Sequence, residues 1–290
     1  MSPLNQRDAA AGAKAGGDAA NNVMLRIASA AVLAPIAIGF AYIGGWLFLA
    51  LCAAAAARIL WEWMRLVADH PDRRMLLLGF AALIAAFFLT GFDEPAAAAT
   101  IVIGAALAGG TLMAPARNSV GWAMGGIFYA GIAFLGPAVL RRDPTLGFTA
   151  VLFVALTVWA TDICAYAAGR AIGGPLLWPE ISPHKTWAGA MGGVLGGVAA
   201  GTMVAYASGI GMLAAIGVIA LLLSLLTQVG DLFESAVKRR FGAKDASHLI
   251  PGHGGLMDRL DGFLVAGFAG LLIGLIRAGI AAPAQGLLVW

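Results

Sequence analysis

The sequence has few charged residues and almost no cysteine. Asp, Glu, Lys and Arg make up 11% of its 290 residues, whereas a soluble globular domain has about 25%. This scarcity excludes a chain that covers its surface with polar groups in water. The two cysteines, Cys52 and Cys164, both lie inside apolar stretches, which argues against a disulfide framework or a zinc site. The net charge of +3 is not concentrated in a basic soluble domain, so no nucleic-acid partner is expected.

Long apolar runs fill the rest of the chain. Hydrophobic residues make up 61%, and the mean hydropathy is +0.88, so lipid is the expected solvent. The runs are continuous and lack alternation, which favours transmembrane helices over a barrel. The expected fold is therefore all-α, a polytopic bundle of about nine spans joined by polar cytoplasmic loops. The predicted spans are 27–44, 46–61, 75–92, 96–114, 119–140, 147–169, 188–208, 210–230 and 260–282.

The basic residues predict the orientation. With the N-terminus in the cytoplasm, all but three of the 18 Lys and Arg residues fall on the cytoplasmic side, as the positive-inside rule requires. The three exceptions are Arg141, Arg142 and Arg277, and the adjacent pair is a local contradiction of the rule. An odd number of spans then places the C-terminus outside.

One predicted span carries glycines at a spacing of four residues. Small residues at this spacing let helix backbones approach closely, which is the interpretation we favour. General glycine richness and a homodimer interface are the alternatives, since the chain has 40 glycines. The glycines are Gly189, Gly193, Gly197 and Gly201.

Two loops on the predicted cytoplasmic side are rich in polar residues, and the longer runs from Asp231 to Asp261. Its first part is predicted to form a short amphipathic helix with Asp231, Glu234, Ser235 and Lys238 on one face. This face is typical of a site for a cation and phosphates. The alternative is a solvated interfacial helix with a Glu234–Lys238 ion pair.

The second part of this loop combines a glycine-rich turn, 251–255, with two carboxylates at the start of the last span. Asp258 and Asp261 lie three residues apart, and such carboxylates at a membrane boundary need a partner or a cation. Magnesium binds to one or two carboxylates together with phosphate oxygens. An ion pair between Asp258 and Arg259 is the structural alternative.

The shorter loop, 170–187, adds further candidates. Asp162 lies near the end of the span before it, where an ionisable residue indicates a functional site or merely reaches water. Ser182, Lys185 and Thr186 precede a helix start, where they can bind phosphate. Helix capping by Ser182 or Thr186 is the alternative.

These residues resemble the phosphatidate cytidylyltransferase family. The family's signature runs through S-x-x-K-R, K-D and P-G-H-G-G-x-x-D-R-x-D, and the whole pattern is in register here. His184 and Ala188 depart from the family's usual Lys and Glu, and the N-terminal half agrees mainly in hydropathy, with Glu62-Trp63 as a weak landmark. The matching residues are Ser235, Lys238, Arg239, Lys244, Asp245, Ile250, Pro251, Gly252, His253, Gly254, Gly255, Asp258, Arg259 and Asp261.

The resemblance implies an enzyme that transfers a cytidylyl group from CTP to phosphatidate, in the inner membrane and among membrane lipid. It implies Mg²⁺, alone or with a second cation, bound by Asp231 and Asp258 with help from Asp261 and Asp162. Lys238 completes the implied catalytic residues. The implied substrate-binding residues are Ser182, Lys185, Thr186, Ser235, Arg239, Lys244, His253 and Arg259.

The implied organisation has three parts: a disordered tail (1–22), N-terminal transmembrane helices (23–145) and a C-terminal catalytic region (146–290). Two other classes remain as alternatives. A CDP-alcohol phosphotransferase needs Ala-Arg after its Asp-Gly, and Asp261-Gly262 lacks it. A transporter would place ionisable groups near the middle of the membrane and show an internal repeat, and neither is clear in the sequence.

Overall fold

The computed structural model describes residues 31–68, 73–112, 120–247 and 255–290. The predicted tail (1–22) and His253 lie outside these ranges. An apolar helix, Ala31–Ile43, comes first. The elements that follow it are α2 (Gly45–Val67), α3 (Arg73–Gly91), α4 (Pro95–Leu112), α5 (Val120–Arg141), α6 (Gly147–Ile172), β1 (Leu176–Trp178), β2 (Ser182–Thr186), α7 (Trp187–Ala207), α8 (Leu213–Arg240), α9 (Met257–Ala278) and α10 (Pro283–Leu288).

The all-α, multi-pass fold is confirmed, and the described residues hold about seven spans where nine were predicted for the chain. Seven helices among the described residues are long and apolar enough to cross a membrane. The other two predicted spans, 27–44 and 96–114, correspond to the shorter apolar helix Ala31–Ile43 and to α4. Crossing the hydrocarbon takes about 20 residues. Apolar composition located both helices, and the described part of the first one begins at Ala31.

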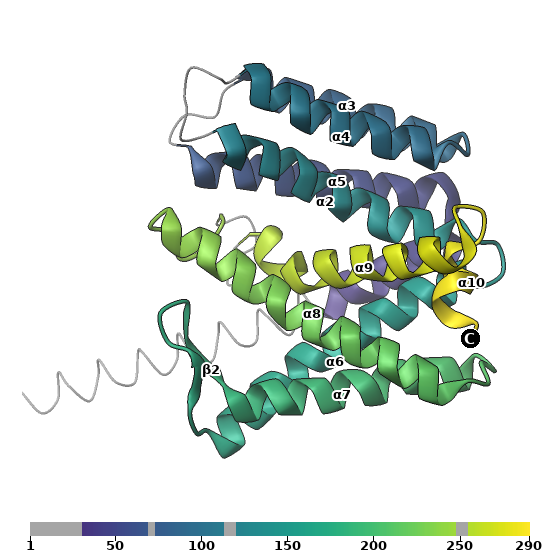
Figure 1. Ribbon diagram of the computed structural model, residues 1–290, viewed down its shortest axis with the longest axis vertical. Coiled ribbons are helices and arrows are strands. Elements are labelled where there is room, and N and C mark those ends of the chain that lie inside the picture. The colour runs from purple at the N-terminus through teal and green to yellow at the C-terminus, as the bar shows by residue number, and fades with distance from the viewer. Residues whose placement is uncertain (1–30, 69–72, 113–119, 248–254) are drawn as a thin grey trace, which may run out of the picture.

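Successive helices run in opposite directions, so the connections alternate between two ends of the bundle (Figure 1). The β1–β2 hairpin, the end of α8 and the start of α9 lie together at one end, which we call the polar end. The connections 92–94, 142–146 and 208–212 lie at the opposite end with the C-terminus. The two polar loops predicted from the sequence therefore share one end.

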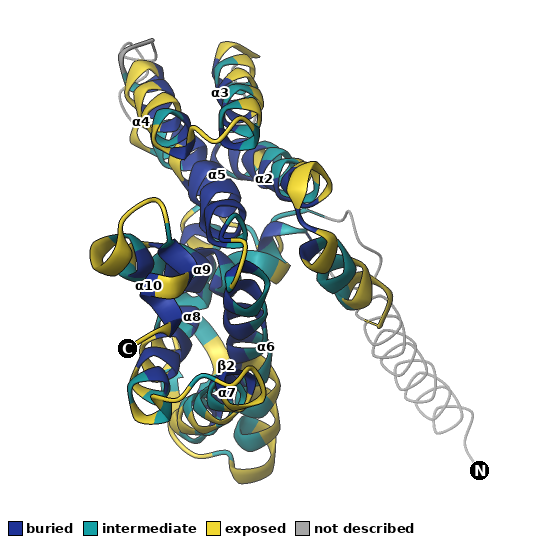
Figure 2. Ribbon diagram, turned by 90° about the vertical axis from the view of Figure 1, so that its right-hand side faces the viewer, coloured by how far each residue is buried: buried dark blue, intermediate teal, exposed yellow. Residues whose placement is uncertain are grey.

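Helix α5 lies at the centre of the bundle, and Figure 2 shows its residues mostly buried. In its most apolar stretch 83% of the residues are buried, against 33% in α3. Helices α3 and α4 project to one side and expose large apolar side chains such as Leu77, Ile84 and Ile103. An exposed apolar surface of this kind suits a lipid environment.

The predicted close packing of the glycine-bearing helix is confirmed. Helix α7 presents its glycines to α6 and α8, and a Cβ atom at Gly193 would lie 2.9 Å from the carbonyl oxygen of Thr161. At the same level Thr161 and Ser224 share a buried hydrogen bond of 2.8 Å between their hydroxyl oxygens. The glycines therefore hold α6, α7 and α8 at backbone contact distance.

Two local predictions at the polar end need correction. The predicted short amphipathic helix is the end of α8, a continuous helix of 28 residues and about 42 Å. The segment predicted as a loop before α7 contains an antiparallel hairpin, in which Leu176 pairs with Thr186 and Trp178 with Ser182. Because no proline or glycine pair interrupts the chain around Asp231, the helix has no reason to end at the membrane surface.

Candidate active site

Glycines let α8 and α9 cross closely just below the polar end. A Cβ atom at Gly230 would lie 2.8 Å from the carbonyl oxygen of Asp261, and one at Gly262 would lie 2.6 Å from the Thr227 side chain. The crossing brings the polar face at the end of α8 against the first turns of α9. Carboxylates that are far apart in the sequence therefore meet.

Lys238 lies at the centre of this meeting point. Its Nζ donates to Asp258 Oδ1 at 2.6 Å and to Glu234 Oε2 at 3.1 Å. The Lys238 side chain is 12% exposed, and those of Asp258 and Glu234 are 9% and 0% exposed. One lysine thus partly neutralises two carboxylates in a place with little water, where charge-assisted hydrogen bonds are strong.

The second oxygen of Asp258 holds the loop before α9. Asp258 Oδ2 accepts hydrogen bonds from the backbone N–H of Ala246 at 2.9 Å and of Gly255 at 2.8 Å. Both oxygens of Asp258 are therefore engaged within the chain. This carboxylate fixes Lys238 on one side and the backbone of the loop on the other.

Asp231 connects the two polar loops. It forms an ion pair with Lys185 at the end of the hairpin, and Ser235 Oγ lies 3.5 Å from its Oδ1 atom. The Lys185 and Asp231 side chains are 27% and 34% exposed, so this part of the site is open. The structure thus brings together Asp231 and Lys185, which the sequence placed in separate loops.

Two buried polar atoms beside this cluster pair with no N–H or O–H group within the described ranges. They are Glu234 Oε1 and the hydroxyl oxygen of Tyr129. The Glu234 and Asp261 side chains lie within hydrogen-bond distance of each other, and both carboxylates lie near Tyr129. Adjacent buried carboxylates repel each other unless a proton or a cation lies between them.

The other predicted residues lie around this centre. Asp162 is exposed on α6 and within electrostatic range of Asp231, Asp261 and Lys185. Thr186 caps α7 by accepting a hydrogen bond from the Gly189 N–H at 3.1 Å, which is the capping alternative. Ser182 lies in β2, paired with Trp178. The predicted phosphate-binding residues Arg239, Lys244 and Arg259 are exposed at the polar end.

Glu62 is the residue at this site whose importance the sequence did not reveal. It is fully buried on α2, and it accepts hydrogen bonds from the N–H groups of Leu256 at 3.1 Å and Met257 at 2.7 Å. From the sequence, Glu62-Trp63 is only a weak landmark of the family resemblance, and Glu62 has no assigned role. The sequence feature that could have pointed to Glu62 is a carboxylate one turn after Arg58, at the end of an apolar helix.

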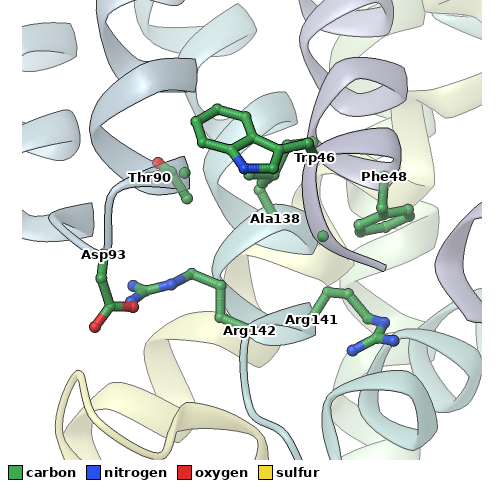
Figure 3. Close-up of a pocket in the computed structure, with 10 residues that line it drawn as sticks. Trp46, Phe48, Thr90, Asp93, Ala138, Arg141 and Arg142 are labelled. Atoms are coloured by element: carbon green, nitrogen blue, oxygen red, sulfur yellow. The ribbon is translucent and has the colours of Figure 1, made fainter. Parts of the chain in front are cut away.

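A separate pocket at the opposite end explains the basic pair that contradicted the orientation rule (Figure 3). Arg142 forms an ion pair with Asp93 across this pocket. Arg141 points away and donates to the carbonyl oxygens of Ala41 and, at 2.9 Å, Tyr42, at the end of the first helix. Both arginines therefore have structural partners, and a cation near a helix C-terminus is favourable.

The fold and the site define a class: a multi-pass α-helical membrane protein with a cluster of paired carboxylates and lysines at one end. Comparison with known proteins then identifies the family. A model described as the cytidylyltransferase family matches residues 24–275. The chain belongs to this family.

Several relatives are named phosphatidate cytidylyltransferases. The chain is 41% identical over 265 residues to one from Brucella suis biovar 1 (strain 1330). The aligned region covers 89% of this chain and 95% of that protein. It is 36% identical over 148 residues to one from Bacillus subtilis (strain 168), covering 51% of this chain and 55% of that protein.

Proposed function

We propose that this protein makes CDP-diacylglycerol and pyrophosphate from CTP and phosphatidate, at the polar end of the bundle and as a step of phospholipid synthesis. The observation that carries the proposal is the joining of Lys185, Asp231, Lys238 and Asp258 at one end of a membrane bundle. The family and the names of its relatives support the same reaction.

The chemistry needs little acid or base. A phosphate oxygen of phosphatidate attacks the α-phosphorus of CTP and forms a new P–O bond. The bond from the α-phosphorus to the oxygen bridging to the β-phosphate breaks, and pyrophosphate leaves with its electrons. Because the nucleophile is already an anion, catalysis consists mainly of charge neutralisation and in-line positioning.

The residues fit a hard cation such as Mg²⁺. The described residues contain no group of three or more His, Cys, Asp or Glu side chains arranged to hold a metal ion. Mg²⁺ does not require such a group, because it commonly binds one or two carboxylates and completes its coordination shell with phosphate oxygens and water. The carboxylates of Glu234 and Asp261, which lie within hydrogen-bond distance of each other, are ligands of the right kind. When bound, the ion would supply positive charge to the triphosphate.

The roles of the residues follow from their partners. Asp231, with Asp261 and Asp162 nearby, would hold the cation. Asp258 was also predicted as a ligand, but its engaged oxygens favour a role in holding Lys238 and the loop. Lys185 and Lys238 would bind phosphate once CTP arrives. Three exposed basic side chains would guide the two anionic substrates to the site, and these are Arg239, one turn after Ser235, Lys244 and Arg259.

The protein would lie in the inner membrane of the cell, with the polar end on the cytoplasmic side and the C-terminus on the outer side. Two features support this orientation. The CTP of the proposed reaction would be supplied from the cytoplasm, and the basic residues Arg141, Arg142 and Arg277 at the opposite end have structural partners there. Phosphatidate would enter with its headgroup at the polar end and its acyl chains between the helices and lipid.

The direct test is product formation by the purified full-length protein. In mixed micelles with phosphatidate, CTP and Mg²⁺, mass spectrometry should detect CDP-diacylglycerol, and omission of any one of these components should abolish it. Absence of product from a folded preparation would contradict the proposal.

A further inference from the structure

Glu62 lies on α2, in the half of the chain that carries none of the other site residues. Its side chain is fully buried. A buried carboxylate is costly unless it is paired and hydrogen-bonded. Glu62 has four donors: Arg58 Nε at 3.0 Å, Ser247 Oγ at 2.7 Å, and the N–H groups of Leu256 and Met257.

Three of these donors come from the two sides of one segment, residues 248–254. Ser247 lies before it, and Leu256 and Met257 lie after it. Asp258 makes a parallel set of contacts, to the N–H groups of Ala246 and Gly255. Two carboxylates, one on α2 and one on α9, thus hold the beginning and the end of the segment together.

Gly255 fits between the two carboxylates. A Cβ atom there would lie 2.8 Å from Glu62 Oε2 and 3.1 Å from Asp258 Oδ2. No side chain larger than hydrogen can occupy this position without moving one of them. The requirement for glycine at 255 therefore has a local steric cause, besides any contact with substrate.

The contacts of Glu62 also set the start of α9. The first N–H groups of a helix lack partners within the helix, and an anion there is favoured by the helix dipole. Met257 is the first residue of α9 and Asp258 is the second. Movement of Glu62 would therefore move Asp258, and with it Lys238.

We propose that Glu62 is a positioning residue for the transfer reaction, which acts through the start of α9 to place Asp258 and Lys238. The expected change in kcat rests on the proposed function. The role of Glu62 in holding the start of α9 does not depend on it. An apolar residue would suffice for packing α2 against α9, whereas a carboxylate is needed to accept from Ser247, Leu256 and Met257 together.

Glu62→Gln tests this with a side chain of the same size. The amide would direct N–H groups toward backbone donors and break the set of contacts. Asp143→Asn is a matched control. Asp143 is a carboxylate with 2% exposure that accepts from the N–H groups of Thr145 at 2.9 Å and Leu146 at 3.0 Å, before α6 at the opposite end.

The expected result is a kcat about 10- to 100-fold lower in Glu62→Gln, the usual effect of losing a residue that orients a catalytic group. The KM for CTP should change less than kcat, and Asp143→Asn should keep the kcat of the wild type. Ser247→Ala removes one donor only, so it should fold readily and lower kcat by less. Equal kcat in Glu62→Gln, Ser247→Ala and the wild type would overturn the proposal.

Hydrogen exchange gives a readout that needs no activity. Glu62→Gln should speed amide exchange in peptides covering 246–258 and leave those covering 143–150 unchanged, and Asp143→Asn should do the reverse. Unchanged exchange at 246–258 in Glu62→Gln would overturn the inference. If the wild type forms no CDP-diacylglycerol, the proposed function fails, and exchange alone decides whether Glu62 holds the start of α9.

Discussion

Lys238 on α8 donates a hydrogen bond of 2.6 Å to Asp258 on α9, although the two residues are 20 positions apart in the chain. The same Nζ donates to Glu234, one turn earlier on α8. Breaking a buried ion pair by removing one partner costs about 3–5 kcal/mol, because the remaining charge is left without compensation. Lys238 therefore stabilises the helix crossing, and under the proposed function it would also bind phosphate.

Replacing Lys238 should affect the reaction much more than replacing another basic residue at the same end. We expect Lys238→Ala to lower kcat/KM by about 100-fold or more, the usual loss when a charge-stabilising contact is removed. Arg73→Ala is the control, since Arg73 is exposed at the start of α3 and lies outside the site. Both values would be measured in mixed micelles for CTP and for phosphatidate.

Stability has to be measured beside these kinetics, because Lys238→Ala leaves Glu234 and Asp258 without their shared partner. A thermal unfolding curve for each variant separates loss of fold from loss of chemistry. Equal kcat/KM in folded Lys238→Ala and Arg73→Ala would mean that these basic residues serve only the general attraction of anionic lipid.

Activity should require a divalent cation and Asp231. Chelation with EDTA should abolish turnover, and Mg²⁺ should restore it. Asp231→Asn should lower turnover by about 100-fold and raise the Mg²⁺ concentration needed for half-maximal activity. Glu180→Gln is a suitable control, because Glu180 is an exposed carboxylate in the hairpin at the same end. The assignment of Asp231 fails if its variant keeps the turnover and Mg²⁺ dependence of the control.

The orientation has its own test. Reporter fusions after Ala207 and at the C-terminus should report an outside location, and fusions within 242–250 should report the cytoplasm. The physical basis is that Lys and Arg are retained on the cytoplasmic side, and the exceptions Arg141 and Arg142 are explained by their contacts with Ala41, Tyr42 and Asp93. A cytoplasmic reading for the C-terminal fusion would contradict this topology.

The features that the sequence predicted well are arrangements within one helix. Asp231, Glu234 and Lys238 lie on one helical face by spacing alone, and the structure adds that this face turns toward α9. The glycine at every fourth position of α7 likewise predicted close packing. Such patterns are local, so one segment of sequence is enough to recognise them.

The partners across the bundle could not be predicted in this way. Nothing in the spacing pairs Glu62 with Met257, 195 positions later, or Lys185 with Asp231. These contacts depend on how α2, the hairpin, α8 and α9 pack. The number of spans was also higher in the prediction than among the described residues, because an apolar composition predicts a membrane environment without giving the number of residues that cross it.

The most direct measurement follows the α-phosphate of CTP. The purified wild-type protein would be given phosphatidate, Mg²⁺ and CTP labelled either at the α-phosphate or at the γ-phosphate. The account predicts that the α-label enters the lipid fraction, that the γ-label appears in pyrophosphate, and that Asp231→Asn loses both products together. A γ-label in the lipid, or no label there from either CTP, would contradict cytidylyl transfer at this site.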